Sequence, residues 1–359
     1  MIPYILVFCT SIFSALAYSY AKDISTRVFL KTALFLILFL PLALRYNIGT
    51  DYSSYSHILE TAFNHNYMPG FEIGWYPIVA VIRVFNLDLQ FFFIIPAFFS
   101  LVIFFHIVPR KKIWFCLPIY FCFSWINSFN IVRQAFSSVI FLLALNNYEK
   151  KNYFFTFLWS IVAICFHKSS VLLLALLLFS HYCKSIENLY LNIFLFLCIL
   201  SVFIIGKIGP RLFDTVVGFT PYAVYLNSVF YQQTKLGSGI GVVLKEFILL
   251  LLLCSTKSIK SERFNKRNDV IRFFVFTMGV SIALSAQIRI FGRLANLFDA
   301  VYVFLIIQLS SSSLKFRKIA LSLIFLITSL LFFKSVFDNP SSANSGLGVF
   351  PYQSIFSSF

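Results

Sequence analysis

The sequence predicts an all-α protein, a polytopic integral membrane helix bundle formed by residues 1–359 as a single transmembrane domain. Hydrophobic residues make up 60% of the chain and charged residues 12%, so its apolar surface exceeds what one soluble core can bury. In lipid, backbone N–H and C=O groups must be paired within the protein, which allows helix bundles and closed barrels. Apolar runs such as Thr32–Leu44 lack the in–out alternation of barrel strands, which leaves the helix bundle.

Short tracts rich in Lys and Arg separate the apolar segments and define the expected topology. Such tracts accumulate in cytoplasmic loops, so the net charge of +16 is interpreted as a topology signal, and no nucleic-acid partner is expected. The tracts are Lys22 to Lys31, Arg110–Lys112, Lys150–Lys151, Lys184, Lys257 to Arg267 and Lys315 to Lys318. The runs between them predict about 12 transmembrane helices with both termini outside. These cover residues 2–20, 30–44, 89–108, 113–127, 131–147, 152–166, 169–183, 189–206, 241–256, 270–287, 294–309 and 319–336.

One apolar segment, Phe71–Phe85, does not fit this alternation. Counting it as a span would invert the orientation of other spans, and its length is short for a hydrocarbon core of about 30 Å. We therefore expect a re-entrant or interfacial segment near residues 55–86, within an external stretch at 45–88. Two other external stretches are expected, at 206–240 and at 337–359, and neither is large enough for an independent domain.

Polar and charged residues outside the basic tracts are the candidates for function, because charge at or inside a span is costly. In the expected topology they all fall on the external face. Asn130, Arg133 and Gln134 are spaced by three and four residues, which predicts one shared helix face. The others are Arg45, Asp51 and Tyr52 after the second span, His167 at an external turn, and Arg289 and Arg293 at the end of the tenth span.

This set suits a lipid-linked pyrophosphate sugar. Arginine binds phosphate oxygens bidentately and stays charged, so arginines at the membrane edge fit a pyrophosphate whose lipid remains in the bilayer. Glycosyl transfer also needs a base for the acceptor hydroxyl, for which Asp51 and His167 are both candidates. Simpler roles remain open. Arg45 is also suited to interfacial anchoring, Arg289 and Arg293 to headgroup binding, and His167 to hydrogen bonding within a turn.

The cysteines and histidines predict no metal site. Seven cysteines lie within or at the ends of apolar segments, with no Cys-x-x-Cys pattern and no paired histidines. Such spacing indicates neither a disulfide framework nor a zinc site, so we interpret the cysteines as packing residues. No cofactor is predicted.

Five short motifs, taken in order, resemble the EpsG/Wzy-type polysaccharide polymerases of bacterial O-antigen and exopolysaccharide synthesis. Each motif is weak alone, but the ordered set covers nearly the whole chain and is specific for the family rather than for its substrate. The motifs are Arg45-x-x-x-Gly49-x-Asp51-Tyr52-x-x-Tyr55, Asn130-x-x-Arg133-Gln134-Ala135, Phe166-His167-x-Ser169-Ser170, Arg289-x-x-x-Arg293 and Phe350-Pro351-Tyr352.

The resemblance implies a metal-independent, GT-C-like glycosyltransferase in the bacterial inner membrane with its active site facing the periplasm. It would transfer a growing glycan from undecaprenyl pyrophosphate onto an incoming undecaprenyl-pyrophosphate-linked repeat unit. A Wzz-type chain-length regulator and a Wzx-type flippase are the implied protein partners. The expected roles are pyrophosphate binding for Arg133, Arg289 and Arg293, leaving-group stabilisation for Arg45, acceptor activation for Asp51 or His167, and substrate contact for Asn130, Gln134 and Tyr52.

Three other functions are compatible with a membrane bundle of this kind. An O-antigen ligase shares donor and fold but uses lipid A-core as the acceptor. A transporter or flippase of lipid-linked oligosaccharide would need charges along a path through the bundle, whereas here they gather at one face. A structural scaffold would leave the arginines unexplained.

Overall fold

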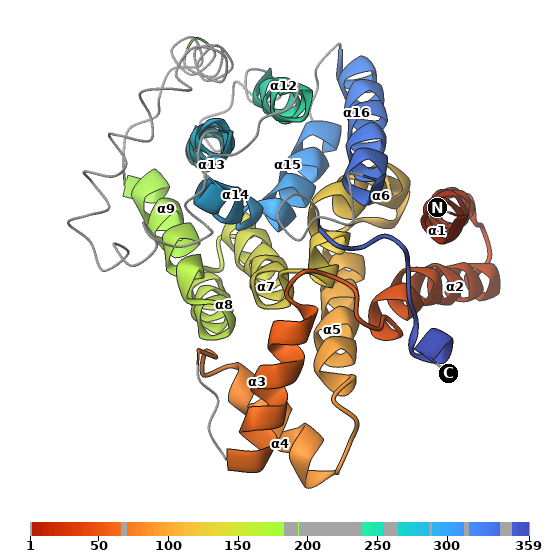
Figure 1. Ribbon diagram of the computed structural model, residues 1–359. Coiled ribbons are helices and arrows are strands. Elements are labelled where there is room, and N and C mark those ends of the chain that lie inside the picture. Colours follow the sequence, from red (N-terminus) through yellow and green to blue (C-terminus); the bar gives the residue numbers. More distant parts are fainter. Residues whose placement is uncertain are drawn as a thin grey trace. The chain divides into compact units, whose positions relative to one another are not determined.

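The computed structural model describes residues 2–65, 70–182, 193, 239–254, 265–286, 289–311, 316–337 and 347–358 (Figure 1). Within these ranges the chain is helical, and its extended pairing is limited to one isolated antiparallel bridge between Arg45 and Ser354. The predicted all-α fold class is therefore confirmed.

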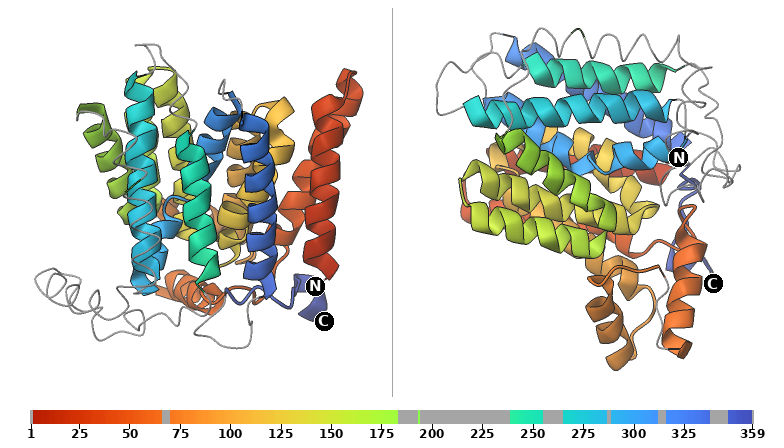
Figure 2. Two further views of the ribbon diagram at one scale, coloured as in Figure 1. Left: turned by 90° about the horizontal axis from the view of Figure 1, so that it is seen from above. Right: turned by 90° about the vertical axis from the view of Figure 1, so that its left-hand side faces the viewer.

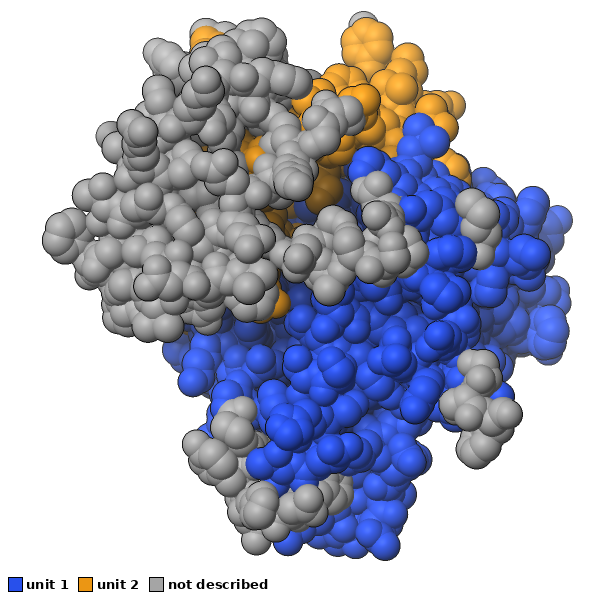
Figure 3. Space-filling view, in the orientation of Figure 1, with its two compact units in different colours: residues 1–173, 299–307, 328–359 blue, residues 174–298, 308–327 orange. Residues whose placement is uncertain are grey.

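The chain divides into two compact units (Figure 3). Unit 1 comprises residues 1–173, 299–307 and 328–359, and unit 2 comprises residues 174–298 and 308–327. The expectation of one transmembrane domain stays a prediction.

Unit 1 is built from helices that follow the apolar runs. Its closest helix pairs are α7 with α8, α1 with α2, and α5 with both α2 and α7. α6 continues through a π turn (Tyr120–Trp125) and a 3-10 turn (Asn127–Phe129) to the start of α7. The helices are α1 (Ile2–Tyr20), α2 (Ile24–Ala43), α3 (Tyr52–His65), α4 (Trp75–Val84), α5 (Phe91–Ile107), α6 (Ile113–Ile119), α7 (Val132–Glu149) and α8 (Tyr153–Phe166), with most of α15 (Asp299–Ser311).

Unit 2 contains most of α9 (Val171–Tyr182) together with α12 (Ile240–Cys254), α13 (Asn265–Ser285) and α14 (Arg289–Asn296). α13 packs against both α12 and α14. The last helix, α16 (Arg317–Phe337), begins in unit 2 and ends in unit 1.

Several helices can cross a bilayer by length and composition. Among the described residues, α1, α2 and α16 qualify singly, and α5 qualifies together with residues 110–129 as a pair bent by 103°. Large side chains such as Phe13 and Phe29, 73% and 71% exposed, cover the outer faces of α1 and α2, as suits contact with lipid.

The predicted spans coincide or overlap with helices wherever the structure describes them. Nearly all of the span at 189–206 and of the external stretch at 206–240 lies outside the described residues, as does part of the stretch at 337–359. The number of about 12 spans therefore stays a prediction.

The apolar segment Phe71–Phe85 forms a helix, α4, that is too short to cross the membrane. α4 has 10 residues. At 1.5 Å per residue this is about 15 Å, roughly half of the hydrocarbon core. α3 lies across the direction of the bundle helices of its own unit (Figure 2). The structure thus agrees with a segment that does not span.

Basic tracts and motif residues lie at opposite ends of unit 1. At one end, the Arg110 guanidinium donates to Ala21 O at 2.9 Å, which joins the turns after α1 and α5. At the other, the Tyr4 hydroxyl donates to Val349 O, so the two chain termini share one end, as expected. We call this second end the motif face and define it by Arg45, Asp51, Asn130, Arg133 and His167.

Candidate functional site

The Arg45–Asp51 segment forms the floor of the motif face, and Gly49 fixes its position. Gly49 has φ +96°, and a Cβ added there would lie 2.1 Å from Phe129 O. Its amide donates to Gly348 O at 3.0 Å. A positive φ and such a close backbone approach both require glycine, which explains this residue in the first motif.

Asn130 joins the first two motifs through its side chain. Its Oδ1 accepts hydrogen bonds from Thr50 Oγ1 at 2.8 Å and from the Asp51 amide at 3.1 Å. The expectation that Asn130 shares a helix face with Arg133 and Gln134 is wrong. Asn130 ends the preceding 3-10 turn and α7 starts at Val132, so the side chain turns toward the 50–51 backbone instead.

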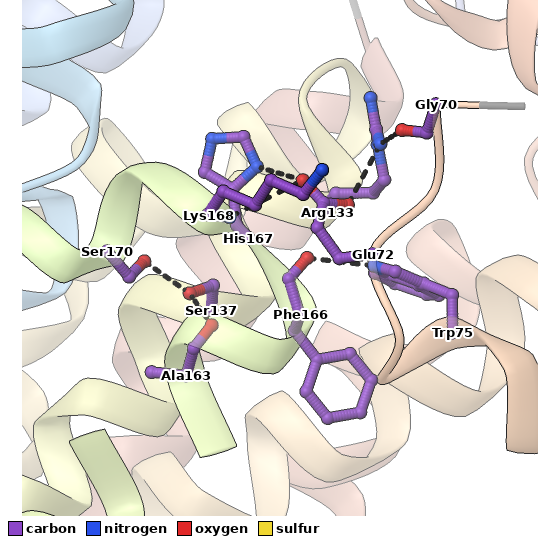
Figure 4. Close-up of polar contacts among 10 residues, drawn as sticks. All are labelled: Gly70, Glu72, Trp75, Arg133, Ser137, Ala163, Phe166, His167, Lys168 and Ser170. Carbon is purple, nitrogen blue, oxygen red and sulfur yellow. Dashed lines mark hydrogen bonds and ion pairs between the residues drawn. The ribbon is translucent and has the colours of Figure 1, made fainter. Parts of the chain in front are cut away.

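The centre of the motif face is the carboxylate of Glu72, which lies between the guanidinium of Arg133 and the imidazole of His167 (Figure 4). Arg133 Nη1 is 2.9 Å from Glu72 Oε2, and His167 Nδ1 is 3.2 Å from Oε1. The Lys168 amide also donates to Oε1, at 3.4 Å. Arg133 Nη1 additionally donates to Gly70 O at 2.5 Å, and its guanidinium lies 4.9 Å from the ring of Phe71.

Backbone contacts hold this carboxylate against the end of α8. The Gly74 amide donates to Cys165 O, and Trp75 Nε1 donates to Phe166 O, each at 2.8 Å. A Cβ on Gly74 would lie 2.8 Å from Cys165 O, so the approach requires glycine. His167 follows with an extended backbone, φ −157° and ψ 113°, which ends α8 beside Glu72.

Buried hydroxyls fix α8 to α7 just below the cluster. Ser137 Oγ donates to Ala163 O at 2.7 Å and lies 2.5 Å from Ser170 Oγ. Both serines are fully buried. Ser170 belongs to the third motif, and this packing gives it a structural role beneath His167.

Charge within the cluster favours an ionised Glu72. Burial raises the pKa of this carboxyl, but the hydrogen bond from His167 and the positive charge of Arg133 outweigh burial, and the pKa falls below the usual value for glutamate. The side chain is 7% exposed, whereas those of Arg133 and His167 are 24% and 21% exposed. The side chains of Arg133 and His167 therefore have access to solvent, and the carboxylate between them is nearly closed off from it.

Arg45 lies below the surface of the motif face, 2% exposed. Its Nη1 donates to Ser128 O at 2.6 Å, and its guanidinium stacks 4.3 Å from the ring of Phe93. Burial lowers its pKa to about 10, so the side chain still carries a charge at neutral pH. Among the described residues, no carboxylate pairs with Arg45. It lines a small cavity with Leu42, Phe93, Pro96, Ala97, Ser100, Ser128, Val132 and Phe136.

The remaining predicted residues of unit 1 lie around these two arginines. The Tyr52 ring stacks on the ring of Phe93, with 5.0 Å between the ring centroids. The Arg45 guanidinium packs against the same Phe93 ring. Asp51 is half-buried and Gln134 is buried. Tyr352, from the last motif, donates to Pro41 O at 3.1 Å and brings the tail to the end of α2.

Arg289 and Arg293 belong to unit 2. Both lie on α14, a separate eight-residue helix after α13 rather than the end of the tenth predicted span. Their spacing of four residues predicts one shared helix face, and Arg293 is exposed. Their participation in a site with the motif face stays a prediction.

Glu72 is the functional candidate that the sequence reading did not select. It lies inside the segment Phe71–Phe85, which the sequence predicts as a re-entrant or interfacial element, whereas the predicted site residues lie at the ends of predicted spans. The available signal was an acidic residue at the start of an otherwise apolar run. No three His, Cys, Asp or Glu residues group closely enough to hold a metal ion in the part of the chain that the structure describes.

One protein family matches most of the chain. The description of the EpsG family matches residues 28–354, from the second helix to the tail. The chain belongs to the EpsG family. No curated protein and no solved structure matches it. EpsG-family membership, with the apolar helices, supports a membrane protein that acts in polysaccharide biosynthesis with a polymerase-like function.

Proposed function

We propose that this EpsG-family protein is an O-antigen polymerase, a Wzy-type membrane glycosyltransferase. It transfers the growing glycan from undecaprenyl pyrophosphate onto an undecaprenyl-pyrophosphate-linked repeat unit. The motif face is the catalytic surface and faces the periplasm across the bacterial inner membrane. A Wzx-type flippase supplies the repeat unit, and a Wzz-type protein regulates chain length.

The observation that carries the proposal is the Glu72–Arg133–His167 cluster at one end of a membrane bundle. It combines a guanidinium suited to phosphate with an imidazole suited to proton transfer, and both are open to solvent. In Figure 4 the end of the Arg133 side chain that is not bonded to Glu72 points away from that carboxylate. A lipid-linked pyrophosphate sugar needs both groups close to the membrane edge.

Each candidate side chain has a role in this proposal. Arg133 binds the donor pyrophosphate, with Arg289 and Arg293 as further phosphate ligands. Arg45 is buried, so it acts on the leaving group through its charge, which the low dielectric of the interior screens weakly. Asp51 or His167 accepts the acceptor proton, and Tyr52, Asn130 and Gln134 contact sugar or order the surface.

Deletion of the gene followed by gel analysis of surface polysaccharide tests the function. A polymerase deletion leaves lipid A-core carrying a single repeat unit. A ligase deletion leaves bare core, and so does loss of a flippase, but with lipid-linked repeat units retained on the cytoplasmic side. Bare core in the deletion strain would contradict the proposal.

Arg133→Ala tests the site, with Arg83→Ala as its matched control. Arg83 is exposed on α4, and the structure gives its side chain no hydrogen bond or ion pair. At equal membrane abundance, we expect Arg133→Ala to lose the polysaccharide ladder and Arg83→Ala to keep it. A full ladder in Arg133→Ala would remove Arg133 from the site.

A further inference from the structure

We propose that Glu72 positions His167 as the general base, so that His167 and not Asp51 takes the proton from the acceptor hydroxyl. The inference rests on the proposed function and names the group that performs its proton transfer. Glu72 acts through His167 and is a positioning residue.

The geometry of the pair defines which nitrogen is the base. Glu72 Oε1 faces Nδ1 of His167 at 3.2 Å, and in Figure 4 the other ring nitrogen points away from the carboxylate. An ionised carboxylate at this position accepts the Nδ1 proton and stabilises the tautomer whose lone pair is on Nε2. Nε2 has no hydrogen-bond partner among the described residues, and the side chain is 21% exposed. The lone pair is therefore open to a substrate.

The same carboxylate is held firmly enough to orient a ring. Glu72 Oε2 pairs with Arg133 Nη1 at 2.9 Å, and the Lys168 amide donates to Glu72 Oε1. The backbone bond from Gly74 to Cys165 fixes Glu72 relative to the residue that follows α8. His167 thus receives a defined tautomer and a defined direction, which are what general base catalysis requires of an imidazole.

The pairing with Arg133 also links proton transfer to donor binding. The guanidinium that would bind pyrophosphate shares one carboxylate with the imidazole that would receive the proton. The acceptor O–H proton goes to Nε2 as the acceptor oxygen bonds to the anomeric carbon. The bond from that carbon to the pyrophosphate oxygen breaks, and its electron pair leaves with undecaprenyl pyrophosphate. The imidazolium formed is stabilised by Glu72.

Purified protein assayed with lipid-linked repeat units over a range of pH tests the inference. We expect His167→Ala and Glu72→Gln to lower kcat by about 10²-fold or more with little change in KM, and Asp51→Asn to retain turnover. Glu60→Gln is the matched control, because Glu60 is exposed on α3 and the structure gives it no ion pair. Glu72→Asp should recover part of the lost kcat.

The split between kcat and KM separates positioning from mere structural support. A damaged site would raise KM or lower membrane abundance in Glu72→Gln, whereas a lost orientation of His167 lowers kcat and is partly restored in Glu72→Asp. Unchanged kcat in Glu72→Gln, or full kcat in His167→Ala, would overturn the inference. Loss of turnover in Asp51→Asn while His167→Ala stays active would assign the base to Asp51.

The tautomer of His167 can be measured without turnover. ¹⁵N NMR of the detergent-solubilised protein, with the resonance assigned by its absence in His167→Ala, should report a protonated Nδ1 in the wild type and a changed tautomer in Glu72→Gln. The same tautomer in both would overturn the inference. A wild-type chain with this tautomer but no activity on lipid-linked repeat units would count against the proposed function alone.

Discussion

Gly49 shows how strongly a single position constrains the motif face. Its positive φ and the closeness of Phe129 O leave room for a hydrogen atom and nothing larger. The backbone of Gly49 lies directly against that of Phe129, next to the second motif. The Asn130 side chain then accepts hydrogen bonds from Thr50 and Asp51, the two residues that follow Gly49.

We expect Gly49→Ala to destabilise the protein by at least about 1–3 kcal/mol from backbone strain, before any cost of displacing the 129–130 turn. Thermal unfolding in detergent measures this. Gly241→Ala is the matched control, since a Cβ there meets no atom within 4 Å and no positive φ is involved. Equal stability of the two variants would contradict the role given to Gly49.

The ion pairs of Glu72 predict a pH dependence. Because its pKa is lowered in the folded protein, Glu72 contributes stability that is complete above the ordinary glutamate pKa near 4.5 and is lost as pH falls below it. The difference in unfolding temperature between wild type and Glu72→Gln should therefore be largest near neutral pH. It should shrink between about pH 5 and pH 3. A constant difference over that range would show that Glu72 is not ionised in the folded protein.

The loop that carries Glu72 is held to α8 by two hydrogen bonds from consecutive residues. Gly74 uses its backbone and Trp75 its indole, and the indole is completely buried. This attachment keeps Glu72 at a fixed distance from His167, although the two residues come from different parts of the chain.

Trp75→Phe tests that attachment. It removes the indole N–H but keeps an aromatic ring, so Phe166 O loses its partner at a cost of about 1–3 kcal/mol. We expect lower thermal stability and reduced ladder formation at normal abundance. Trp114→Phe, a substitution of the same kind on α6, is the control. Unchanged stability in Trp75→Phe would mean that the Gly74 bond alone holds the loop.

At the scale of elements, the apolar runs predicted the helices well, because the position of a helix in a membrane protein follows from its hydrophobic length. They missed the π turn at Tyr120–Trp125, which lies inside the predicted span 113–127, because a mostly apolar sequence gives no signal for a change of helix type. They also placed Asn130 on α7, because spacing alone cannot reveal that its amide is needed by Thr50 and Asp51.

The site was predictable in part for a related reason. Arg45, Asp51, Asn130, Arg133 and His167 gather at one end of unit 1, as the basic tracts implied. Glu72 is not apparent from the sequence because its significance comes from two partners, Arg133 and His167, that are 61 and 95 residues away along the chain. Arg45 was predicted at the surface, yet its stacking on Phe93 buries it, and that contact depends on tertiary packing.

On the scale of the whole molecule, the two ends of unit 1 differ in charge and so in the side of the membrane that each should face. In a cysteine-free background, we expect Tyr46→Cys, on the motif face, to react with a membrane-impermeant thiol reagent added to spheroplasts. Lys22→Cys, at the basic end, should react only after the membrane is permeabilised. Both positions are exposed. The reverse pattern would contradict a periplasmic motif face.

The contacts of the tail determine when the motif face can form during synthesis of the chain. Tyr352 bonds to Pro41 across 311 residues, and the Tyr46 amide bonds to Gln353 O. Since a chain is synthesised from its N-terminus, the Arg45 segment cannot complete these contacts until Tyr352 and Gln353 have left the ribosome. The motif face therefore stays incomplete while the helices between the two segments are made, and any binding of substrate there depends on the arrival of the tail.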